Sequence, residues 1–204
     1  MNAIEILGLT KEYGGRRVVD ELELTVPAGE LFALLGINGA GKSTTIKMLS
    51  CLTVPTAGDA NLMGHSIRSD SRAAKELLAV SPQETAIAPN LTVWENLELM
   101  AGVYRRPREA AEEVLAQLGL GAWAKARAKT LSGGWQRRLS IAMALVSQPE
   151  VLFLDEPTLG LDVLARRELW GVIRGLKGHT AMVLTTHYLE EAESLADRIG
   201  IMNQ

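Results

Sequence analysis

One short stretch of the chain, GINGAGKS at residues 36–43, restricts the possible folds more than any other feature. It fits the pattern G-x-x-x-x-G-K-[S/T] at every specified position. The apolar run LFALL precedes it, and KSTTIKMLSCL, whose spacing predicts a helix, overlaps its end. A glycine-rich turn between a buried strand and a helix is the context in which this pattern forms a phosphate-binding loop, or P-loop.

The residue types of this loop suit a nucleoside triphosphate. Glycines allow successive backbone N–H groups to surround the β-phosphate, and the helix that begins near Lys42 adds its dipole. We expect Lys42 to reach the β- and γ-phosphate oxygens and the Ser43 hydroxyl to coordinate Mg²⁺. The expected nucleotide contacts in this loop are Gly36, Ile37, Asn38, Gly39, Ala40, Gly41, Lys42, Ser43 and Thr44.

A second motif, VLFLDE at residues 151–156, consists of four apolar residues followed by two acids. It predicts a buried strand that delivers carboxylates at its carboxyl end, where open α/β sheets place their ligands. We expect Asp155 to hold Mg²⁺ through water and Glu156 to act as the general base that polarises the attacking water. The two motifs together predict a P-loop NTPase.

The order of apolar runs predicts the remainder of an α/β fold. Two alternating stretches before residue 30, AIEILGLT and VVDELELTV, are separated by Gly14 and Gly15 and predict an antiparallel flank. Strand-like and helix-like segments alternate after residue 149, which favours a mostly parallel sheet. We expect one domain over residues 1–204, with the P-loop core and its flank at 1–82 and 149–204 and a mainly helical subdomain at 83–148.

Composition and charge limit the classes of binding partner that we expect. The net charge of −3, the pI near 5.7 and the scattered Lys and Arg residues give no reason to expect nucleic acid. No stretch approaches the roughly 18 uninterrupted apolar residues of a membrane span, so we expect a soluble chain. The single cysteine, Cys51, excludes an internal disulfide.

The stretch LSGGWQRRLS at residues 131–140 calls for a separate explanation. Ser132 is a typical N-cap, and Leu139, Ala142 and Leu145 follow at helical spacing, so the pattern predicts an amphipathic helix that begins beside the glycines. The positive end of such a helix attracts an anion.

Taken together and in this order, the motifs resemble the nucleotide-binding domain of ATP-binding cassette (ABC) transporters over essentially the whole chain. The resemblance implies that Tyr13 stacks on adenine, that Gln83 senses Mg²⁺ and the γ-phosphate, and that His187 contacts the γ-phosphate and orients the water. It also implies a D-loop, in which Asp162 links two sites across an interface. The residues implied for the D-loop and the signature are Gly160, Leu161 and Asp162, and Leu131, Ser132, Gly133, Gly134 and Trp135.

Several of these residues have plainer interpretations when taken singly. Tyr13 could be an ordinary strand-end aromatic, Gln83 a loop amide, and His187 a capping or surface histidine. Trp135 departs from the glutamine that is common in the family, and it either packs on the subdomain or stacks near a ribose. We expect this tryptophan to leave ATP hydrolysis intact.

The resemblance also implies an assembly. The helix end at Ser132 suits a γ-phosphate, but the P-loop of the same chain already surrounds its own nucleotide. A head-to-tail homodimer, or a pair with another ABC ATPase domain, would hold each ATP between one P-loop and the opposite signature, and hydrolysis would open it. A separate polytopic membrane subunit is expected to dock near Gln83 to Tyr104, at the cytoplasmic face of the inner membrane. There Trp94, Leu97 and Met100 form either an apolar docking face or part of the core.

The stretches GINGAGKSTTIKMLS and LSGGWQRRLSIAMALVSQPEVLFLDEPTLGLD resemble the bacterial branch that exports drugs, ions or polysaccharide. Export is therefore the favoured direction, and an importer ATPase is the nearest alternative. A soluble ABC ATPase of translation or DNA repair is a further alternative, which the single cassette and the lack of a heptad run between Gly41 and Leu131 disfavour. The presence of Glu156 and His187 disfavours a nucleotide-binding regulator without turnover.

Overall fold

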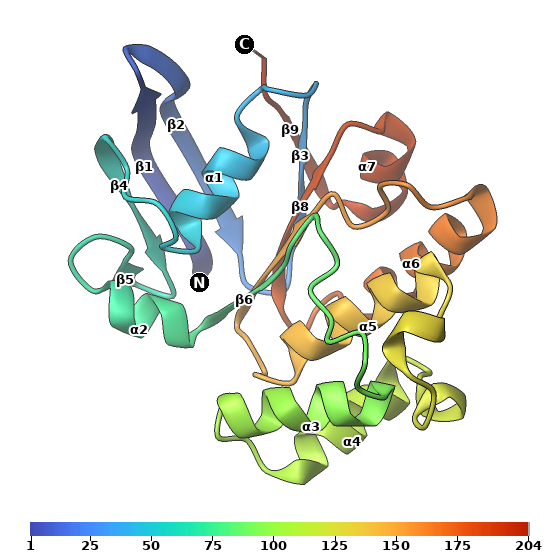
Figure 1. Ribbon diagram of the computed structural model, residues 1–204. Coiled ribbons are helices and arrows are strands. Elements are labelled where there is room, and N and C mark those ends of the chain that lie inside the picture. The colour runs from blue at the N-terminus through green and yellow to red at the C-terminus, as the bar shows by residue number, and fades with distance from the viewer. Residues whose placement is uncertain (204) are drawn as a thin grey trace.

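The computed structural model describes residues 1–203, which form two sheets and the helices that cover them (Figure 1). The strands are β1 (Asn2–Tyr13), β2 (Arg16–Pro27), β3 (Leu31–Leu35), β4 (Ala57–Leu62), β5 (His65–Ser66), β6 (Leu78–Ser81), β7 (Val151–Asp155), β8 (Ala181–Thr186) and β9 (Arg198–Ile201). The α-helices are α1 (Lys42–Leu49), α2 (Ser71–Glu76), α3 (Val93–Val103), α4 (Arg108–Gln117), α5 (Gly133–Leu145), α6 (Val163–Gly175) and α7 (Leu189–Leu195). Two short 3-10 helices lie at Gly121–Trp123 and Ala128–Thr130.

The larger sheet has the strand order β6-β7-β8-β3-β9, and every neighbouring pair in it is parallel. The three central strands, β3, β7 and β8, are largely apolar and buried because both faces of the sheet are covered there, as expected for a parallel sheet. The carboxyl ends of its strands lie at one edge, so the P-loop after β3, the acids that end β7 and His187 after β8 come together there (Figure 1).

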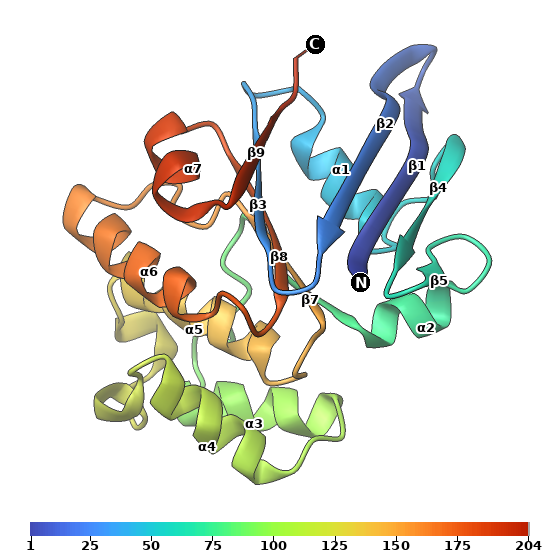
Figure 2. The ribbon, with the colours of Figure 1, turned by 180° about the vertical axis from the view of Figure 1, so that it is seen from behind.

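The smaller sheet has the order β2-β1-β4-β5 and is antiparallel. This sheet confirms the predicted flank and extends it, because β4 and β5 also join it. The helix α1 lies between the two sheets (Figures 1 and 2). Ile46 and Met48 of this helix share a hydrophobic core with Ile4 of β1 and with Phe32 and Phe153 of the parallel sheet.

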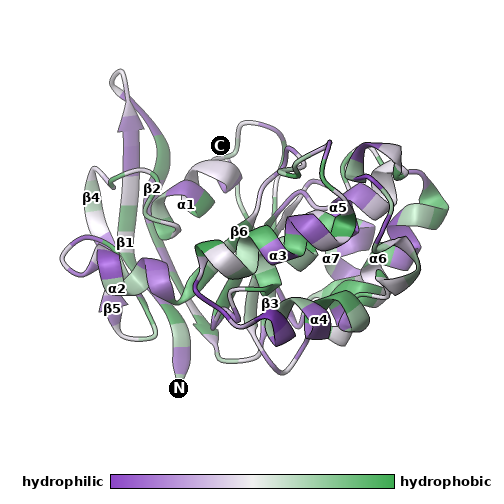
Figure 3. Ribbon diagram, turned by 60° about the horizontal axis from the view of Figure 1, so that its bottom comes forward, coloured by the Kyte–Doolittle hydropathy of each residue, from purple (hydrophilic) through white to green (hydrophobic). Residues whose placement is uncertain are grey.

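The opposite face of the parallel sheet is covered by the remaining helices. Alternate residues of the same strands, among them Leu31 and Leu152, belong to a second core together with Leu97 of α3, Leu139 of α5 and Ile173 of α6. The hydropathy view shows hydrophobic and hydrophilic segments next to one another along the helices on this side of the sheet (Figure 3). The chain thus places one continuous core between the helices and the sheet that carries the acids.

The helical segment bears on the two alternatives left open for the stripe on α3. Leu97 is fully buried, and Trp94 and Met100 are partly buried against the same core, so their packing favours the core alternative. The predicted helix at 42–52 ends at Leu49, because Cys51 adopts a left-handed φ of 56°. Within residues 1–203, no helix combines the length and apolar character that crossing a bilayer requires.

Candidate active site

A cavity of about 360 Å³ opens at the carboxyl edge of the parallel sheet. It is lined by Val18, Asn38, Gly39, Gly41, Lys42, Ser43, Thr44, Gln83, Glu156, Leu159 and His187. The structure therefore brings most of the P-loop together with the second acid of β7, the loop glutamine and the histidine. These residues come from five separate segments of the sequence, and the topology of the parallel sheet is what unites them.

Two glycines of the P-loop are required by the close approach of neighbouring backbone. Gly41 has a φ of 97°, and a Cβ built there would lie 2.5 Å from the carbonyl oxygen of Val18. A Cβ on Gly36 would lie 2.7 Å from the carbonyl oxygen of Met202. Side chains at these positions would force the loop away from its neighbours, so glycine keeps the amides of the loop facing the cavity.

Lys42 is buried at the start of α1 and faces the acids of β7. Its Nζ donates to the carbonyl oxygens of Gly36 at 2.7 Å and Ile37 at 3.1 Å. The same nitrogen lies 3.5 Å from Glu156 Oε1. The amine thus stands between the loop that would hold phosphate and the predicted general base, and it partly neutralises that base.

Asp155 contacts Ser43, the residue that follows Lys42 at the start of α1. Its Oδ1 accepts a hydrogen bond of 3.1 Å from Ser43 Oγ and another from Thr185 Oγ1. A hydroxyl and a carboxylate held side by side, with Gln83 in the same cavity, suit Mg²⁺, which uses few protein oxygens and takes the others from water and phosphates. Among residues 1–203 no group of three or more His, Cys, Asp and Glu side chains is arranged as a metal site. The assignment of Ser43, Gln83 and Asp155 as magnesium ligands stays a prediction.

Glu156 is held in an unusual backbone conformation. Its φ is 46°, in the left-handed region that non-glycine residues rarely occupy. The backbone N–H of Glu156 donates to both the carbonyl and the hydroxyl oxygens of Thr185, at 3.1 and 3.0 Å. Backbone strain of this kind gathers at functional sites, and here it turns the Glu156 side chain away from Asp155 and into the cavity.

His187 lies directly beyond the end of β8 and beside the predicted base. Its Nδ1 is 3.3 Å from Glu156 Oε2, although the two atoms are not aligned for a hydrogen bond. Its ring contacts that of Tyr188, with centroids 4.0 Å apart. Glu156 is thus flanked by Lys42 on one oxygen and by His187 on the other, a geometry in which both neighbours can fix the carboxylate.

Gln83 is exposed at the rim of the cavity, and its backbone is tied to the helix that follows the signature. The guanidinium of Arg137 donates to the carbonyl oxygens of Pro82 and Gln83. Arg137 is itself buried, and this burial lowers its pKa below the ordinary value for arginine. The loop that carries Gln83 and the helix α5 are therefore mechanically connected.

The signature residues lie apart from this cavity. Ser132 is the N-cap of α5, as predicted, but its hydroxyl caps no backbone N–H of the described chain. Ser132 and Gly133 are exposed, whereas Leu131 is buried. Gly134 approaches α6 so closely that an added Cβ would lie 3.0 Å from the Cβ of Ala165. The signature therefore presents its serine outward while packing against the helix that follows the D-loop.

Trp135 and the D-loop residues have defined structural roles. The ring of Trp135 lies 5.5 Å from that of Trp123 and 4.2 Å from the guanidinium of Arg138, which identifies it as a packing residue in this chain. Asp162 is the N-cap of α6, and its Oδ1 accepts from the backbone N–H groups of Leu164 and Ala165. Gly160 is exposed with a φ of 78°, which favours glycine.

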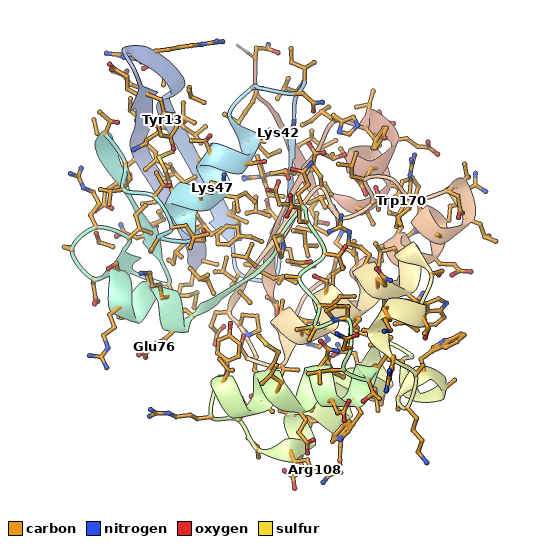
Figure 4. All side chains as sticks on the ribbon, viewed as in Figure 1. Tyr13, Lys42, Lys47, Glu76, Arg108 and Trp170 are labelled. Carbon is orange, nitrogen blue, oxygen red and sulfur yellow. The ribbon has the colours of Figure 1, made fainter. Side chains whose placement is uncertain are left out.

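Tyr13 is a further predicted site residue that does not line the cavity. It is exposed at the end of β1, and Lys11 Nζ lies 4.9 Å above its ring. Figure 4 shows Tyr13 on the antiparallel sheet, to one side of Lys42. Val18 of the neighbouring strand lines the cavity in its place. The stacking of Tyr13 on adenine stays a prediction.

Four residues at or beside the site belong to no motif that predicted them: Val18, Arg137, Leu159 and Thr185. Thr185 is fully buried and bonds Asp155, but only the register that pairs Asp155 with Thr185 across β7 and β8 reveals it. The sequence could have indicated the role of Arg137, because an arginine on the buried side of an amphipathic helix needs hydrogen-bond acceptors for its N–H groups.

These features define a P-loop nucleotide-binding site on a parallel α/β sheet, and comparison with known proteins narrows the class. The family model described as ABC transporter matches residues 19–159, so the chain belongs to the ABC transporter family. It is 45% identical over 206 residues to the daunorubicin/doxorubicin resistance ATP-binding protein DrrA of Streptomyces peucetius, a match that covers 98% of this chain and 62% of that protein. The Nod factor export ATP-binding protein I of Rhizobium sp. (strain N33) is 43% identical, with 98% and 67% covered.

Solved structures agree with this assignment. A dimeric structure of a bacterial ABC transporter cassette superposes with a TM-score of 0.83 at 27% identity, covering 98% of this chain and 94% of that chain. The structure of an ATP-binding subunit of an ABC transporter gives a TM-score of 0.85 at 29% identity, with 98% and 86% covered. The chain spans 62% and 65% of the lengths of the two daunorubicin resistance relatives that it matches.

Proposed function

We propose that this chain binds ATP with Mg²⁺ and hydrolyses it as the ATPase subunit of an ABC transporter. The observation that carries this proposal is the arrangement of Lys42, Glu156 and His187 around one cavity, with the acid between the two nitrogen-bearing side chains. Membership of the ABC transporter family and the names of the relatives support it.

The residues of the cavity divide the reaction between them. Lys42 exchanges its bonds to the P-loop carbonyls for phosphate oxygens, while the loop amides hold the β-phosphate. Ser43, Asp155 and Gln83 would hold Mg²⁺, and the ion would supply positive charge to neutralise the transferring phosphoryl group. Glu156 accepts the proton of the attacking water, and His187 orients that water and the γ-phosphate.

The test of hydrolysis is a steady-state measurement of phosphate release from ATP and Mg²⁺. Glu156→Gln preserves the shape of the side chain and removes the base, so kcat is expected to fall by a factor of about 100 or more. ATP binding, which depends on the P-loop, is expected to persist in this variant. Phosphate release at the wild-type rate by Glu156→Gln would exclude Glu156 as the base.

We further propose that the site is completed by a second cassette. The exposed Ser132 and Gly133 at the start of α5 supply a hydroxyl and backbone amides that suit a γ-phosphate, and none of residues 131–135 lines the cavity of its own chain. In a head-to-tail pair these groups would face the nucleotide of the partner. The dimeric cassette among the similar structures supports such a pairing.

Light scattering with ATP tests the pairing. Glu156→Gln is expected to accumulate as a dimer, because ATP bound between two chains is not consumed. Adding Ser132→Glu to that variant places a carboxylate against the γ-phosphate and is expected to return it to the monomer. A persistent dimer in the double variant would argue against the role of Ser132.

We propose a docking site for the membrane subunit in the groove between α2 and the end of α3. This groove has a volume of about 800 Å³, and Lys75, Leu77, Val103, Tyr104 and Arg106 are among the residues that line it. Val103 and Tyr104 are exposed apolar side chains with cationic neighbours, which suits an amphipathic segment with acidic ends. The groove includes the end of the segment Gln83 to Tyr104, and it is not lined by Trp94, Leu97 or Met100.

Co-purification with a co-expressed polytopic membrane protein that binds the wild-type chain tests the groove. Val103→Glu is expected to reduce recovery of that protein at least about tenfold, because it buries a carboxylate in the apolar part of the contact. Leu99→Glu is the matched control, since Leu99 is also an exposed residue of α3 but does not line the groove. Equal recovery with the two variants would place the docking site elsewhere.

Export is the direction that we propose, at the cytoplasmic face of the membrane. The support comes from the relatives, which include a daunorubicin/doxorubicin resistance protein and Nod factor export proteins. We further propose that the helical segment 83–148 moves as a unit during the cycle, because Arg137 connects the loop of Gln83 to the signature helix.

A further inference from the structure

The carboxylate of Glu191 is buried and is not explained by any role described above. Glu191 is 1% exposed in the first turn of α7. Its Oε1 accepts a hydrogen bond of 2.7 Å from Thr158 Oγ1 and one of 3.0 Å from Trp170 Nε1. Both donors are neutral and both are buried. A buried carboxylate is costly unless it is fully hydrogen-bonded, so both bonds are needed to keep it in place.

The three residues of this cluster come from three segments that also carry predicted site residues. These site residues are Glu156, Asp162 and His187. Thr158 lies two residues after Glu156, and successive turns join the two, with Leu159 N–H donating to Glu156 O and Leu161 N–H to Thr158 O. Trp170 belongs to α6, which Asp162 caps. Glu191 belongs to α7, which begins two residues after His187. One carboxylate oxygen therefore connects the turn after the general base, the D-loop helix and the helix after the histidine.

The cluster is reinforced on its exposed side. The guanidinium of Arg166, one turn before Trp170 on α6, lies 4.4 Å from the ring centroid of Tyr188. That ring contacts the imidazole of His187. The histidine is thus braced against α6 through Tyr188, while the turn after Glu156 is braced against the same helix through Glu191. Figure 4 places the labelled Trp170 on the side of the molecule where α6 and α7 lie.

We propose that Glu191 is a positioning residue for ATP hydrolysis, which sets Glu156 and His187 relative to each other through its shared bonds to Thr158 and Trp170. Glu191 does not line the cavity that is proposed to hold the nucleotide. The inference rests on the proposed function, because it assumes that Glu156 and His187 act on the attacking water. Loss of the cluster should slow the chemical step while leaving the P-loop contacts to ATP unchanged, so it should lower kcat and not raise KM.

The experiment measures kcat and KM for ATP in the full chain, together with the urea unfolding midpoint. Thr158→Val and Glu191→Ala each remove a partner and are expected to lower kcat at least about tenfold, with KM changed less than about threefold. Glu191→Gln keeps an oxygen that can accept both bonds, and Thr158→Ser keeps the hydroxyl. Both conservative variants are expected to stay within about threefold of the wild-type kcat.

Thr10→Val separates positioning from general stability. Thr10 is also a buried threonine, and its hydroxyl bonds the carbonyl of Gly8 and the N–H of Glu21 in the antiparallel sheet. This control is expected to lower the urea midpoint as Thr158→Val does while leaving kcat within about threefold. An equal fall in kcat in the control and in Thr158→Val would overturn the positioning role.

These measurements distinguish a failure of the proposed ATPase function from a failure of the proposed role of Glu191. If the wild type releases no phosphate that depends on Glu156, the proposed function is overturned and this inference with it. If the wild type hydrolyses ATP but Thr158→Val and Glu191→Ala keep the wild-type kcat, the proposed function stands and the role of Glu191 is overturned. A kcat that falls in both variants and is retained in Thr158→Ser supports the role.

Discussion

Ser43 and Asp155 are joined by a hydrogen bond of 3.1 Å, although 112 positions separate them in the sequence. Ser43 is the last residue of the P-loop motif and lies in the first turn of α1, and Asp155 ends β7. The bond fixes the distance between the loop that would hold phosphates and the strand that delivers the carboxylates. Because the two oxygens converge on one point, they are expected to share a metal ion.

Asp155→Asn tests that shared role. The amide keeps a bond to Ser43 but loses the negative charge that favours Mg²⁺, so kcat is expected to fall by a factor of about 100 and the Mg²⁺ concentration for half-maximal activity to rise. Phosphate release measured against Mg²⁺ concentration gives both values. Ser43→Thr, which keeps the hydroxyl, serves as the conservative control. An unchanged Mg²⁺ dependence in Asp155→Asn would show that Asp155 does not hold the ion.

The residues proposed to bind phosphate and metal could be identified from the sequence because each belongs to a local pattern. GINGAGKS and VLFLDE carry their chemistry within eight and six residues, and the structure places both at the edge where such residues act. Thr185 could not be predicted in this way. Its bond to Asp155 depends on the register of β8 against β7. The sequence TAMVLTT is equally compatible with a register shifted by one residue.

The same limit applies to the helical segment. The spacing of Trp94, Leu97 and Met100 identifies one face of α3 but does not say whether protein or solvent covers it. Leu97 became core because α5 and the parallel sheet lie beneath α3, which is a fact of tertiary packing. Arg137 is the converse case, since a cationic residue became buried because the carbonyls of the Gln83 loop receive it.

Thr185→Val is expected to impair the site without touching a predicted ligand. The variant removes the hydroxyl that donates to Asp155 and accepts from the N–H of Glu156. Loss of these buried bonds is expected to cost about 1–3 kcal/mol of unfolding free energy, and kcat should fall at least about tenfold as both acids shift. Urea unfolding and phosphate release measure the two effects.

Thr180→Val is the matched control for this prediction. Thr180 immediately precedes β8 and donates to the carbonyl of Pro149, at the opposite end of the strand from the acids. Its loss should lower stability by a similar or smaller amount and leave kcat unchanged. If Thr185→Val also keeps the wild-type kcat, the acids are held by other contacts.

Trp135→Gln restores the residue that is common in the family and is expected to change kcat by less than about tenfold, because the indole packs within its own chain. The unfolding free energy should fall by about 1–2 kcal/mol, since contacts with the ring of Trp123 and with Arg138 are lost. A double-mutant cycle with Trp123→Leu isolates the ring contact, and a coupling energy near zero would show that the two rings do not support each other. A larger change in kcat would assign Trp135 to the nucleotide.

Asp197 makes stability depend on pH at the opposite edge of the parallel sheet. Its Oδ2 accepts from the N–H of Leu31 at the start of β3, and its Oδ1 accepts from Lys177 Nζ at 2.6 Å. Burial alone would raise the pKa of Asp197, but the bonds from Lys177 and Leu31 outweigh it and hold that pKa below its ordinary value. A carboxyl with a lowered pKa in the folded state stabilises the fold above its unfolded pKa, and this contribution is lost as pH falls through the folded pKa.

Asp197→Asn is therefore expected to destabilise the chain at pH 7 and to have no effect in strong acid. At neutral pH the variant loses the charge that Lys177 pairs with, at a cost of about 1 kcal/mol of unfolding free energy for this partly exposed pair. Once the pH falls below the lowered pKa of Asp197, the wild-type carboxyl is itself protonated, so the two unfolding curves should converge. Urea unfolding of both chains from pH 7 to pH 2.5 measures the difference, and a gap that stays constant over this range would mean that the ionised carboxylate contributes nothing to holding β3.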